Sequence, residues 1–411
     1  MLNKKTYIDL FAGCGGLSLG LHQAGWQGLF AVEKSPFAFL TLKHNLIDKL
    51  NHFDWPDWLA KTEHDIDEVL KTKKTNLRLL RGKVDMVAGG PPCQGFSSAG
   101  KRDETDHRNK LIYSYIAFIR LVQPKVIFFE NVKGFTLKFQ KNKTKGINYS
   151  EFVKKSLRRS GKDFLGYEVY GQLVDFSEFG VPQKRTRFIL VGIRNDLASS
   201  FRFTPMEFFN TLQKNKIQFL ANKGICLSQS VSDAISDLLL SNGTIDCPDS
   251  KGFLSAMYGE QNGGFQRLLR GNKEVGLIPD SHRLTNHSKD TVDLFCNLLK
   301  NAPKGKRIEG EERLKFNLKK RGLTILDVNK PAPTLTSHPD DCLHYSEPRI
   351  LTVREYARIQ SFPDWYEFKA KYTTGGKARK NEVPRYTQIG NAIPPLFGEQ
   401  AGEALKTLIN G

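Results

Sequence analysis

The first half of the chain alternates between short apolar runs and segments whose apolar residues recur at helical spacing. Leu17–Ala24 and Leu111–Val122 have the periodicity of helices. Strands that alternate with helices form a mostly parallel sheet covered on both faces, so an α/β domain is predicted here. The runs expected to be strands are Tyr7–Phe11, Leu29–Val32, Val84–Ala88, Val126–Phe129, Tyr167–Leu173 and Phe188–Gly192.

The pattern weakens from about Arg194. Up to about Pro331 the chain is polar, basic and weakly periodic, and Lys300–Arg321 is dense in charge. Apolar pattern returns at Ile350–Phe362 and at Ile389–Ile409, the latter predicted as a turn followed by a helix. A chain of 411 residues is too long for one ordinary domain. We therefore expect a second, smaller domain in the middle of the sequence.

Composition narrows the class of protein. A hydrophobic fraction of 39% can form a sizeable core. Lys and Arg number 62 against 43 Asp and Glu, and the net charge of +19 favours a polyanionic partner. A solvated basic surface explains the same excess, so charge alone leaves both interpretations open.

The six cysteines contain no CxxC pair, which favours a reducing cytosol and argues against a zinc site. There is no apolar run of 18 residues and no signal-peptide cleavage site at the amino terminus. We therefore expect a cytoplasmic protein with no membrane segment and no metal.

A glycine-rich turn, Asp9–Gly16, lies between the first strand and the first helix. A dinucleotide-binding GxGxxG motif starting at Gly13 fails, because its third glycine falls on Ser18. The failed motif favours a nucleoside ligand without phosphates over a dinucleotide. Glu33, at the tip of the next strand, is placed to accept hydrogen bonds from ribose hydroxyls. A turn needed for packing alone is the open alternative.

Cys93 lies in a second turn, Gly89–Ser97, which also follows an apolar strand. A lone cysteine is more often a small buried hydrophobe. Here paired glycines and prolines fix the backbone and place the thiol at the carboxyl edge of the sheet, where open α/β folds bind ligands. The segment after it, Gly95–Lys110, is predicted to be a loop able to close over a substrate.

Glu130 follows Val126–Phe129, which brings a carboxylate to the same edge as the thiol. Its partly apolar setting predicts a raised pKa and a role as proton donor, and a capping carboxylate is the alternative. Arg185 and Arg187 precede the last strand and share one face of an extended segment. Beside the thiol and the carboxylate, they are candidates to hold an oxyanion or a carbonyl.

Six motifs occur in one order along the chain: DLFAGCGG, GGPPCQGFS, ENV, QKRTR, LTVREYARIQSFPD and QIGNAIPP. In this the sequence resembles the DNA (cytosine-5)-methyltransferase family over Tyr7–Ile193 and about Pro331–Gly411. The resemblance implies a Rossmann-like S-adenosylmethionine-dependent methyltransferase domain with a mostly parallel sheet, plus a smaller target-recognition domain. Residues 1–195 and 384–411 would be catalytic, and 196–383 would recognise the target, with a variable part at about 198–330.

Site residues follow from the resemblance by position. Phe11 would stack on the adenine of S-adenosylmethionine, and Glu33 would hold its ribose. Cys93 is similar to the family's nucleophile, Glu130 to the acid on the cytosine ring, and Arg187, with Arg185 behind it, to the arginine pair at the cytosine carbonyl. The remaining cofactor wall would consist of Cys14, Gly16, Asp65, Ile66, Pro92, Leu111 and Asn391.

The implied chemistry explains these residue types. A thiolate that adds to carbon 6 of cytosine makes carbon 5 electron-rich enough to take a sulfonium methyl group. A base inside a duplex cannot reach such a pocket, so the target cytosine must be flipped out. The resemblance therefore implies double-stranded DNA as partner. It also implies a protective methylase, with a separate restriction endonuclease acting on the same site, and a monomer.

Three other functions remain open at this point. The first is an RNA cytosine-5-methyltransferase, since one branch of the family modifies tRNA with the same motifs. The second is a catalytically silent DNA-binding relative, against which the intact Cys93, Glu130 and Arg187 argue. The third is a nicotinamide-dependent oxidoreductase, which the failed glycine spacing disfavours.

Overall fold

The computed structural model describes residues 4–92, 110–137, 148–198, 204–318, 322–375, 378 and 382–410. The chain divides into two compact units. The first unit comprises Met1–Asp175, Thr186–Lys216 and Gly398–Gly411, and the second comprises Phe176–Arg185 and Ile217–Phe397. Residues 196–216 thus lie with the first unit and 384–397 with the second, which differs from the expected boundaries. Which unit recognises a target stays a prediction.

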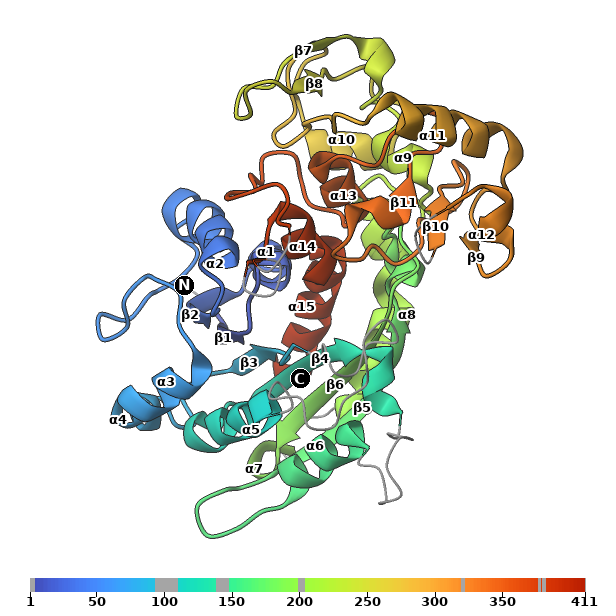
Figure 1. Ribbon diagram of the computed structural model, residues 1–411. Helices are drawn as coiled ribbons and strands as arrows, with labels where there is room; N and C mark the ends of the chain where they lie inside the picture. Colours follow the sequence, from blue (N-terminus) through green and yellow to red (C-terminus); the bar gives the residue numbers. More distant parts are fainter. Residues whose placement is uncertain are drawn as a thin grey trace. The chain divides into compact units, whose positions relative to one another are not determined.

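A six-stranded sheet with the order β2-β1-β3-β4-β6-β5 forms the centre of the first unit (Figure 1). The adjacent strands β2, β1, β3 and β4 pair in parallel, and β6 is antiparallel to both β4 and β5. The mostly parallel sheet expected from the sequence is therefore confirmed. The strands are β1 (Thr6–Leu10), β2 (Gln27–Val32), β3 (Met86–Gly89), β4 (Val126–Val132), β5 (Tyr167–Asp175) and β6 (Thr186–Arg194).

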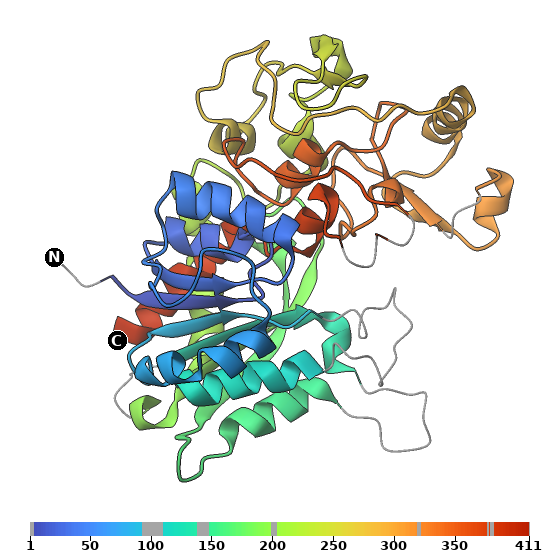
Figure 2. The same ribbon diagram turned by 60° about the vertical axis from the view of Figure 1, so that its left-hand side comes forward.

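Helices lie on both faces of this sheet, with α5 and α6 on one face and α1 and the end of α15 on the other (Figure 2). None of the helices in the described ranges is both long and apolar enough to cross a membrane. Two helices, α8 (Pro205–Asn222) and α15 (Pro395–Asn410), run from one unit into the other. The other helical segments of the first unit are α1 (Gly16–Gln23), α2 (Pro36–Leu42), η1 (Lys43–Lys49), α3 (Ile66–Thr72), α4 (Lys74–Leu79), α5 (Leu111–Val122), η3 (Lys133–Thr136), α6 (Tyr149–Arg158) and α7 (Asn195–Ala198).

The last helix packs closely on the first. A Cβ added to Gly402 would lie 2.6 Å from the Cβ of Ala24, so only glycine allows the two backbones to approach this closely. The indole N–H of Trp26 donates to the carbonyl of Gly402 at 3.0 Å. These contacts fix the end of the chain beside the helix that follows the glycine-rich turn.

The second unit is built from short elements around two small sheets, β11-β10-β9 and β7-β8. One core cluster gathers Phe295 and Leu298 of α11 with apolar residues of the three-stranded sheet, including Ile308 and Ile325. Strands of two to four residues leave almost no periodicity, which is why the sequence pattern did not reveal them. The elements are η4 (Phe176–Phe179), α9 (Val231–Ile235), η5 (Leu240–Asn242), β7 (Thr244–Asp246), β8 (Leu254–Ala256), α10 (Gly264–Arg270), α11 (Lys289–Asn301), β9 (Arg307–Glu309), α12 (Glu312–Lys315), β10 (Gly322–Ile325), η6 (Pro339–Asp341), β11 (Cys342–Leu343), α13 (Val353–Ile359) and α14 (Arg385–Asn391).

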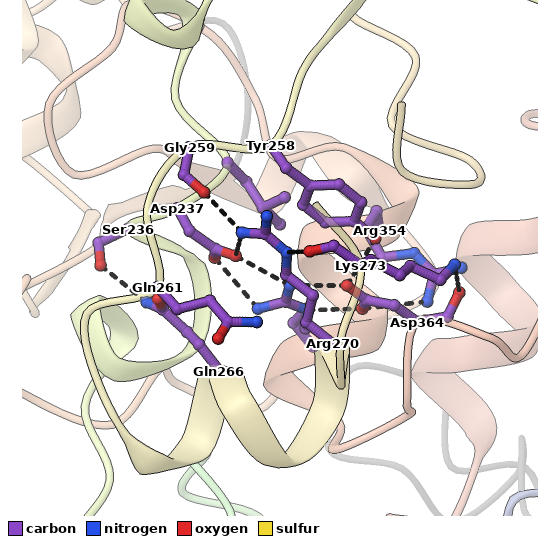
Figure 3. A network of polar contacts seen from close by, with 12 residues as sticks. Ser236, Asp237, Tyr258, Gly259, Gln261, Gln266, Arg270, Lys273, Arg354 and Asp364 are labelled. Atoms are coloured by element: carbon purple, nitrogen blue, oxygen red, sulfur yellow. Dashed lines mark hydrogen bonds and ion pairs between the residues drawn. The ribbon is translucent and has the colours of Figure 1, made fainter. Parts of the chain in front are cut away.

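A buried network of ion pairs joins α13 to the rest of the second unit (Figure 3). Arg358 donates to both oxygens of Asp364, at 2.6 and 2.7 Å, and to both oxygens of Asp237, each at 3.1 Å. Arg270 also donates to Asp237, and the hydroxyl of Tyr258 donates to Asp364 at 2.7 Å. All five side chains are buried, so each charge depends on its partners.

Replacing Arg358 with alanine should therefore destabilise the protein strongly, because Asp237 and Asp364 would each lose a buried partner. Breaking a buried pair from one side costs about 3–5 kcal/mol. Urea unfolding of the full chain measures the loss. Arg267→Ala, which removes an exposed arginine from α10, is the control and should change the free energy of unfolding by less than about 0.5 kcal/mol. Equal effects of the two substitutions would contradict the importance of the network.

Candidate active site

The order of strands in the sheet reverses between β1 and β3. From β1 the chain continues to β2 on one side and later to β3 on the other. In open α/β sheets such a reversal leaves a crevice beyond the carboxyl ends of the strands, where ligands bind. The glycine-rich turn leaves β1 at this edge, and the Gly-Gly-Pro-Pro turn leaves β3. The first residues of β6 reach the same edge, because β6 is antiparallel to β4.

The glycine-rich turn holds its backbone in an unusual conformation. Gly13 and Gly15 have φ angles of 57° and 88°, and Phe11 has a φ of 59°. A side chain other than glycine in this left-handed region stores roughly 1–3 kcal/mol of strain, and such strain gathers at ligand sites. The N–H of Ala12 donates to the carbonyl of Val32 at 3.2 Å, which joins the turn to the end of β2.

Glu33 closes this turn from the side of β2. One carboxylate oxygen accepts the N–H of Gly13 at 2.9 Å, and the other accepts the N–H of Ser35 at 2.7 Å. Burial raises the pKa of the Glu33 carboxyl, and the hydrogen bonds from these N–H groups oppose that shift. The backbone N–H of Lys34 adds a third hydrogen bond to this carboxylate. A carboxylate offers about four lone-pair positions, so the group can still accept a hydroxyl donor.

Asp65 and Ile66 lie directly beside Glu33 at the start of α3. The N–H of His64 donates to the carbonyl of Glu33 at 2.7 Å. Asp65 caps α3 through the N–H of Asp67 and pairs with Lys34 at 2.6 Å, while Ile66 is buried. Burial favours a higher pKa for Asp65, but the hydrogen bonds from Lys34 and Asp67 outweigh it and lower the pKa. The structure thus brings two of the predicted cofactor residues, Asp65 and Ile66, next to a third, Glu33.

Asp9 and Ser18 form a buried pair beneath the turn that the sequence reading missed. The hydroxyl of Ser18 donates to Asp9 at 2.5 Å, and both side chains are buried. Burial raises the pKa of Asp9 to about 7, and the charge of Glu33 adds to the shift while the hydrogen bond from Ser18 opposes it. An acidic residue inside the apolar run Tyr7–Phe11 was the available signal, since it needs a partner there. Ser18, where the dinucleotide motif fails, is that partner.

Two glycines allow the tips of β1, β3 and β4 to converge. A Cβ on Gly89 would lie 1.9 Å from the carbonyl oxygen of Leu10, and a Cβ on Gly90 would lie 1.8 Å from that of Glu130. Asn131 of β4 then donates through its side-chain amide to the carbonyl of Pro91 at 3.2 Å. The turn that leads to Cys93 is therefore fixed against both neighbouring strands.

Cys93 itself lies outside the described residues, as does the predicted substrate loop up to residue 109. Pro92, the last described residue before this stretch, is exposed, whereas Pro91 is buried. The described part of the turn thus emerges from the sheet at Pro92.

Glu130 and Arg187 form an ion pair at the same edge. The Nε of Arg187 lies 3.0 Å from a carboxylate oxygen of Glu130, and the side chains keep 12% and 18% of their surface exposed. The two residues come from antiparallel neighbours, β4 and β6, in which Val132 pairs with Arg187. A largely buried pair that keeps some exposed surface can both donate and accept hydrogen bonds toward a ligand beside it.

Arg185 makes a different set of contacts. Its guanidinium is buried and donates to the carbonyls of Leu335 at 3.3 Å and Gly390 at 2.8 Å. The amide of Gln360 donates to the preceding carbonyl, that of Ile389, at 3.0 Å. Of the two predicted arginines, Arg187 therefore pairs with Glu130, while Arg185 helps to cap the carboxyl end of α14. Asn391, the last residue of that helix, is exposed.

The remaining predicted residues lie at helix starts. Gly16 begins α1 and Leu111 begins α5. Cys14 is buried, and burial raises the pKa of its thiol to about 12, so it is a neutral packing group at physiological pH. No group of three or more His, Cys, Asp or Glu side chains is arranged to hold a metal ion among the described residues.

Comparison with known proteins identifies the family to which this chain belongs. A model of the C-5 cytosine-specific DNA methylase family matches residues 5–407, nearly the whole chain. The chain belongs to this family and is thus a DNA (cytosine-5)-methyltransferase, as the ordered motifs predicted.

Three curated relatives are similar over most of their own length. They are the Type II methyltransferases M.DdeI of Desulfomicrobium norvegicum (29% identical, covering 97% of this chain and 88% of that protein), M1.HphI of Haemophilus parahaemolyticus (30%, 97% and 86%) and M.PspPI of a Psychrobacter species (31%, 98% and 80%). A crystal structure of a DNA modification methyltransferase encoded in an E. coli prophage superposes with a TM-score of 0.65 at 24% identity, covering 99% of this chain and 100% of that one. At that identity the superposition shows the fold alone, which agrees with the predicted α/β class.

Asp9 should make the stability of the protein depend on pH. Its pKa of about 7 in the folded state exceeds the usual value of 3.8, so the folded state binds the proton more tightly. The resulting stabilisation is complete below pH ~4 and is lost as the pH rises through about 7. Asp9→Asn keeps an acceptor for Ser18 and does not titrate. The free energy of unfolding is measured for wild type and variant at each pH. The value for wild type minus the value for the variant should fall by on the order of 1 kcal/mol per pH unit between pH 5 and 7. A difference that is constant with pH would contradict a buried, titrating Asp9.

Proposed function

We propose that the protein transfers a methyl group from S-adenosylmethionine to carbon 5 of a flipped-out cytosine in a specific double-stranded DNA sequence, through a covalent bond between Cys93 and carbon 6. The largely buried Glu130–Arg187 pair carries this proposal, because it lies at the sheet edge where the Pro91–Pro92 turn, which precedes Cys93 in the sequence, is fixed against β4. The family to which the chain belongs supports the same reaction.

The described residues fit S-adenosylmethionine at the end of β1 and β2. A Cβ built on Gly13 would meet no atom of the described residues within 4 Å, so the described part of the chain leaves space beside this turn. Glu33 keeps a lone pair for a ribose hydroxyl, and Phe11 offers an aromatic ring for the adenine. When bound, the cofactor supplies an electrophilic methyl group on a sulfonium. The proposed wall is completed by Cys14, Gly16, Asp65, Ile66, Pro92, Leu111 and Asn391.

The side chains of the protein would activate the cytosine. The thiolate of Cys93 forms a bond to carbon 6, and the electrons of the 5,6 double bond shift toward carbon 5 and the ring. Glu130 donates a proton or hydrogen bond to ring nitrogen 3, and Arg187 donates to the carbonyl oxygen, so both stabilise the charge that develops. Arg185, two residues before Arg187 in the chain, would support Arg187. A base, which water can provide, then removes the proton from carbon 5, and the bond to Cys93 breaks.

Recognition of DNA would fall to residues 196–383, with the variable part at about 198–330. The names of the similar Type II methyltransferases support a protective role in a restriction–modification system, with a separate endonuclease acting on the same site. The net charge of +19 suits a polyanionic partner. We place the reaction in the cytosol and expect a monomer to perform it.

Transfer of a tritiated methyl group tests the reaction. Wild-type protein is incubated with labelled S-adenosylmethionine and either mixed-sequence DNA or tRNA. The proposal requires label in DNA, recovered as 5-methylcytosine. Label in tRNA alone would establish an RNA methyltransferase instead, and label in neither substrate would contradict an active methyltransferase.

Cys93→Ser should abolish turnover, because a serine hydroxyl is a far weaker nucleophile than a thiolate at neutral pH. Binding of S-adenosylmethionine and DNA should stay within about threefold of wild type, since neither depends on the bond to carbon 6. Cys226→Ser, which changes an exposed free thiol, is the matched control and should retain full activity. Substantial methylation by Cys93→Ser would remove Cys93 as the nucleophile.

Glu33→Gln should weaken cofactor binding, because it removes the charged acceptor proposed for the ribose hydroxyls. Hydrogen bonds to a charged group contribute about 1.5–3 kcal/mol, so the dissociation constant measured by calorimetry should rise about 10- to 150-fold. Glu168→Gln, at an exposed position of β5, provides the control. An unchanged affinity in Glu33→Gln would contradict the ribose role.

A further inference from the structure

Four side chains of the second unit form one continuous stack. The Cζ of Arg283 lies 4.1 Å from the ring centre of Phe253 and 3.8 Å from that of Tyr372. The Cζ of Arg385 lies 4.0 Å from the ring centre of Tyr372. Two guanidinium groups cannot share one ring face at these distances, so the order is Phe253, Arg283, Tyr372, Arg385. Both faces of the Arg283 guanidinium are therefore covered by aromatic rings.

The two arginines in this stack differ in how their donors are used. Arg385 is buried and donates to the carboxylate of Asp249 at 2.8 Å, the hydroxyl of Ser281 at 3.0 Å and the carbonyl of Ala370 at 2.9 Å. Tyr372 also donates to Asp249, at 2.8 Å. Arg385 is thus neutralised and held on all sides, and its place in the stack is explained by stability alone.

Among the described residues, the guanidinium of Arg283 has one weak hydrogen-bond partner, the hydroxyl of Ser250 at 3.3 Å. Within the described residues it forms no ion pair with a carboxylate. The side chain is half-buried, and none of its nitrogens is among the buried polar atoms without a partner, so its unused N–H groups reach solvent. The stack therefore carries one uncompensated positive charge with its donors exposed at the edge.

This geometry suits recognition of a flat pair of acceptors. Stacking on both faces fixes the plane of the guanidinium and reduces the rotamer entropy lost on binding. The donors that remain lie in that plane and point out of the stack. In the major groove of DNA, guanine presents O6 and N7 as two acceptors in one plane, and an arginine can bind both at once. A phosphate can also accept two donors of an arginine, but its tetrahedral oxygens do not require one particular plane, so the double stack favours the planar base.

We propose that Arg283 is a specificity-determining residue that reads a guanine of the methylated DNA sequence. The inference rests on the proposed function, because it requires that the protein act on DNA. It also requires that the second unit carry the recognition surface. Arg283 lies within the predicted target-recognition segment, residues 196–383. The stack of Phe253 and Tyr372 would be the device that holds the reader in place.

The test compares Arg283→Lys and Arg283→Gln with wild type on defined duplexes. The wild-type site is first mapped by sequencing methylated cytosines in a random-sequence library, and failure of wild type at this step would count against the proposed function, not against Arg283. Then kcat/KM is measured on the mapped site and on duplexes in which each guanine is replaced in turn. Arg267→Ala, at an exposed arginine of the same unit, is the control.

If Arg283 reads a base, both variants should lose about 5- to 150-fold in kcat/KM on the mapped site, and the loss should disappear on duplexes altered at one guanine only. A uniform loss of kcat/KM on every duplex, together with a logarithmic salt dependence whose slope is smaller by about one, would show a phosphate contact. That result would overturn the proposal. Unchanged specificity with a lowered unfolding temperature would show a structural role and overturn it equally. Affinity for S-adenosylmethionine should stay unchanged in both variants.

Discussion

The close approach of strand tips at Gly89 and Gly90 is the constraint on which the candidate active site depends. Any side chain at these positions would place a Cβ less than 2 Å from the carbonyl oxygens of Leu10 and Glu130. Because both residues are glycine, β1, β3 and β4 can meet at one edge of the sheet. The glycine-rich turn, the Pro91–Pro92 turn and the carboxylate of Glu130 then lie within a few residues of this contact, at the point where the strand order reverses.

The two units use charge in different ways. In the second unit, Arg358 and Arg270 are buried and matched with Asp237 and Asp364, so these charges organise the unit and are closed to ligands. In the first unit, the Glu130–Arg187 pair keeps part of its surface exposed. A pair that is still open to solvent can exchange partners with a substrate, which a closed network cannot do without losing several kcal/mol. Partial exposure therefore distinguishes the Glu130–Arg187 pair from the buried Arg358 network.

Sequence reasoning was most effective where one short segment carries both the fold and the site. The bounds of α5 agree with the predicted helix Leu111–Val122, and Glu130 and Arg187 do meet at one edge. Asp65 was assigned to the cofactor wall by the resemblance alone, and the hydrogen bond from His64 to Glu33 and the ion pair with Lys34 show that it lies beside Glu33. The roles of the site residues in binding and catalysis remain predictions.

Contacts between residues far apart in the chain could not be predicted. The partners of Arg185 are backbone carbonyls at Leu335 and Gly390, and a carbonyl leaves no mark in the sequence. The stack around Arg283 joins Phe253 to Tyr372 across more than a hundred residues of weakly patterned chain. The same holds for the strands of the second unit, which are too short to show periodicity.

The central claim is that Cys93 bonds covalently to the target cytosine, and trapping that bond tests it most directly. A duplex that carries fluorine in place of the hydrogen on carbon 5 blocks the final elimination, because no proton can be removed there. With S-adenosylmethionine present, the account predicts a complex that survives denaturing electrophoresis, with the DNA attached to the peptide that contains Cys93. Methylation of ordinary DNA without any trapped complex, or attachment at another residue, would contradict it.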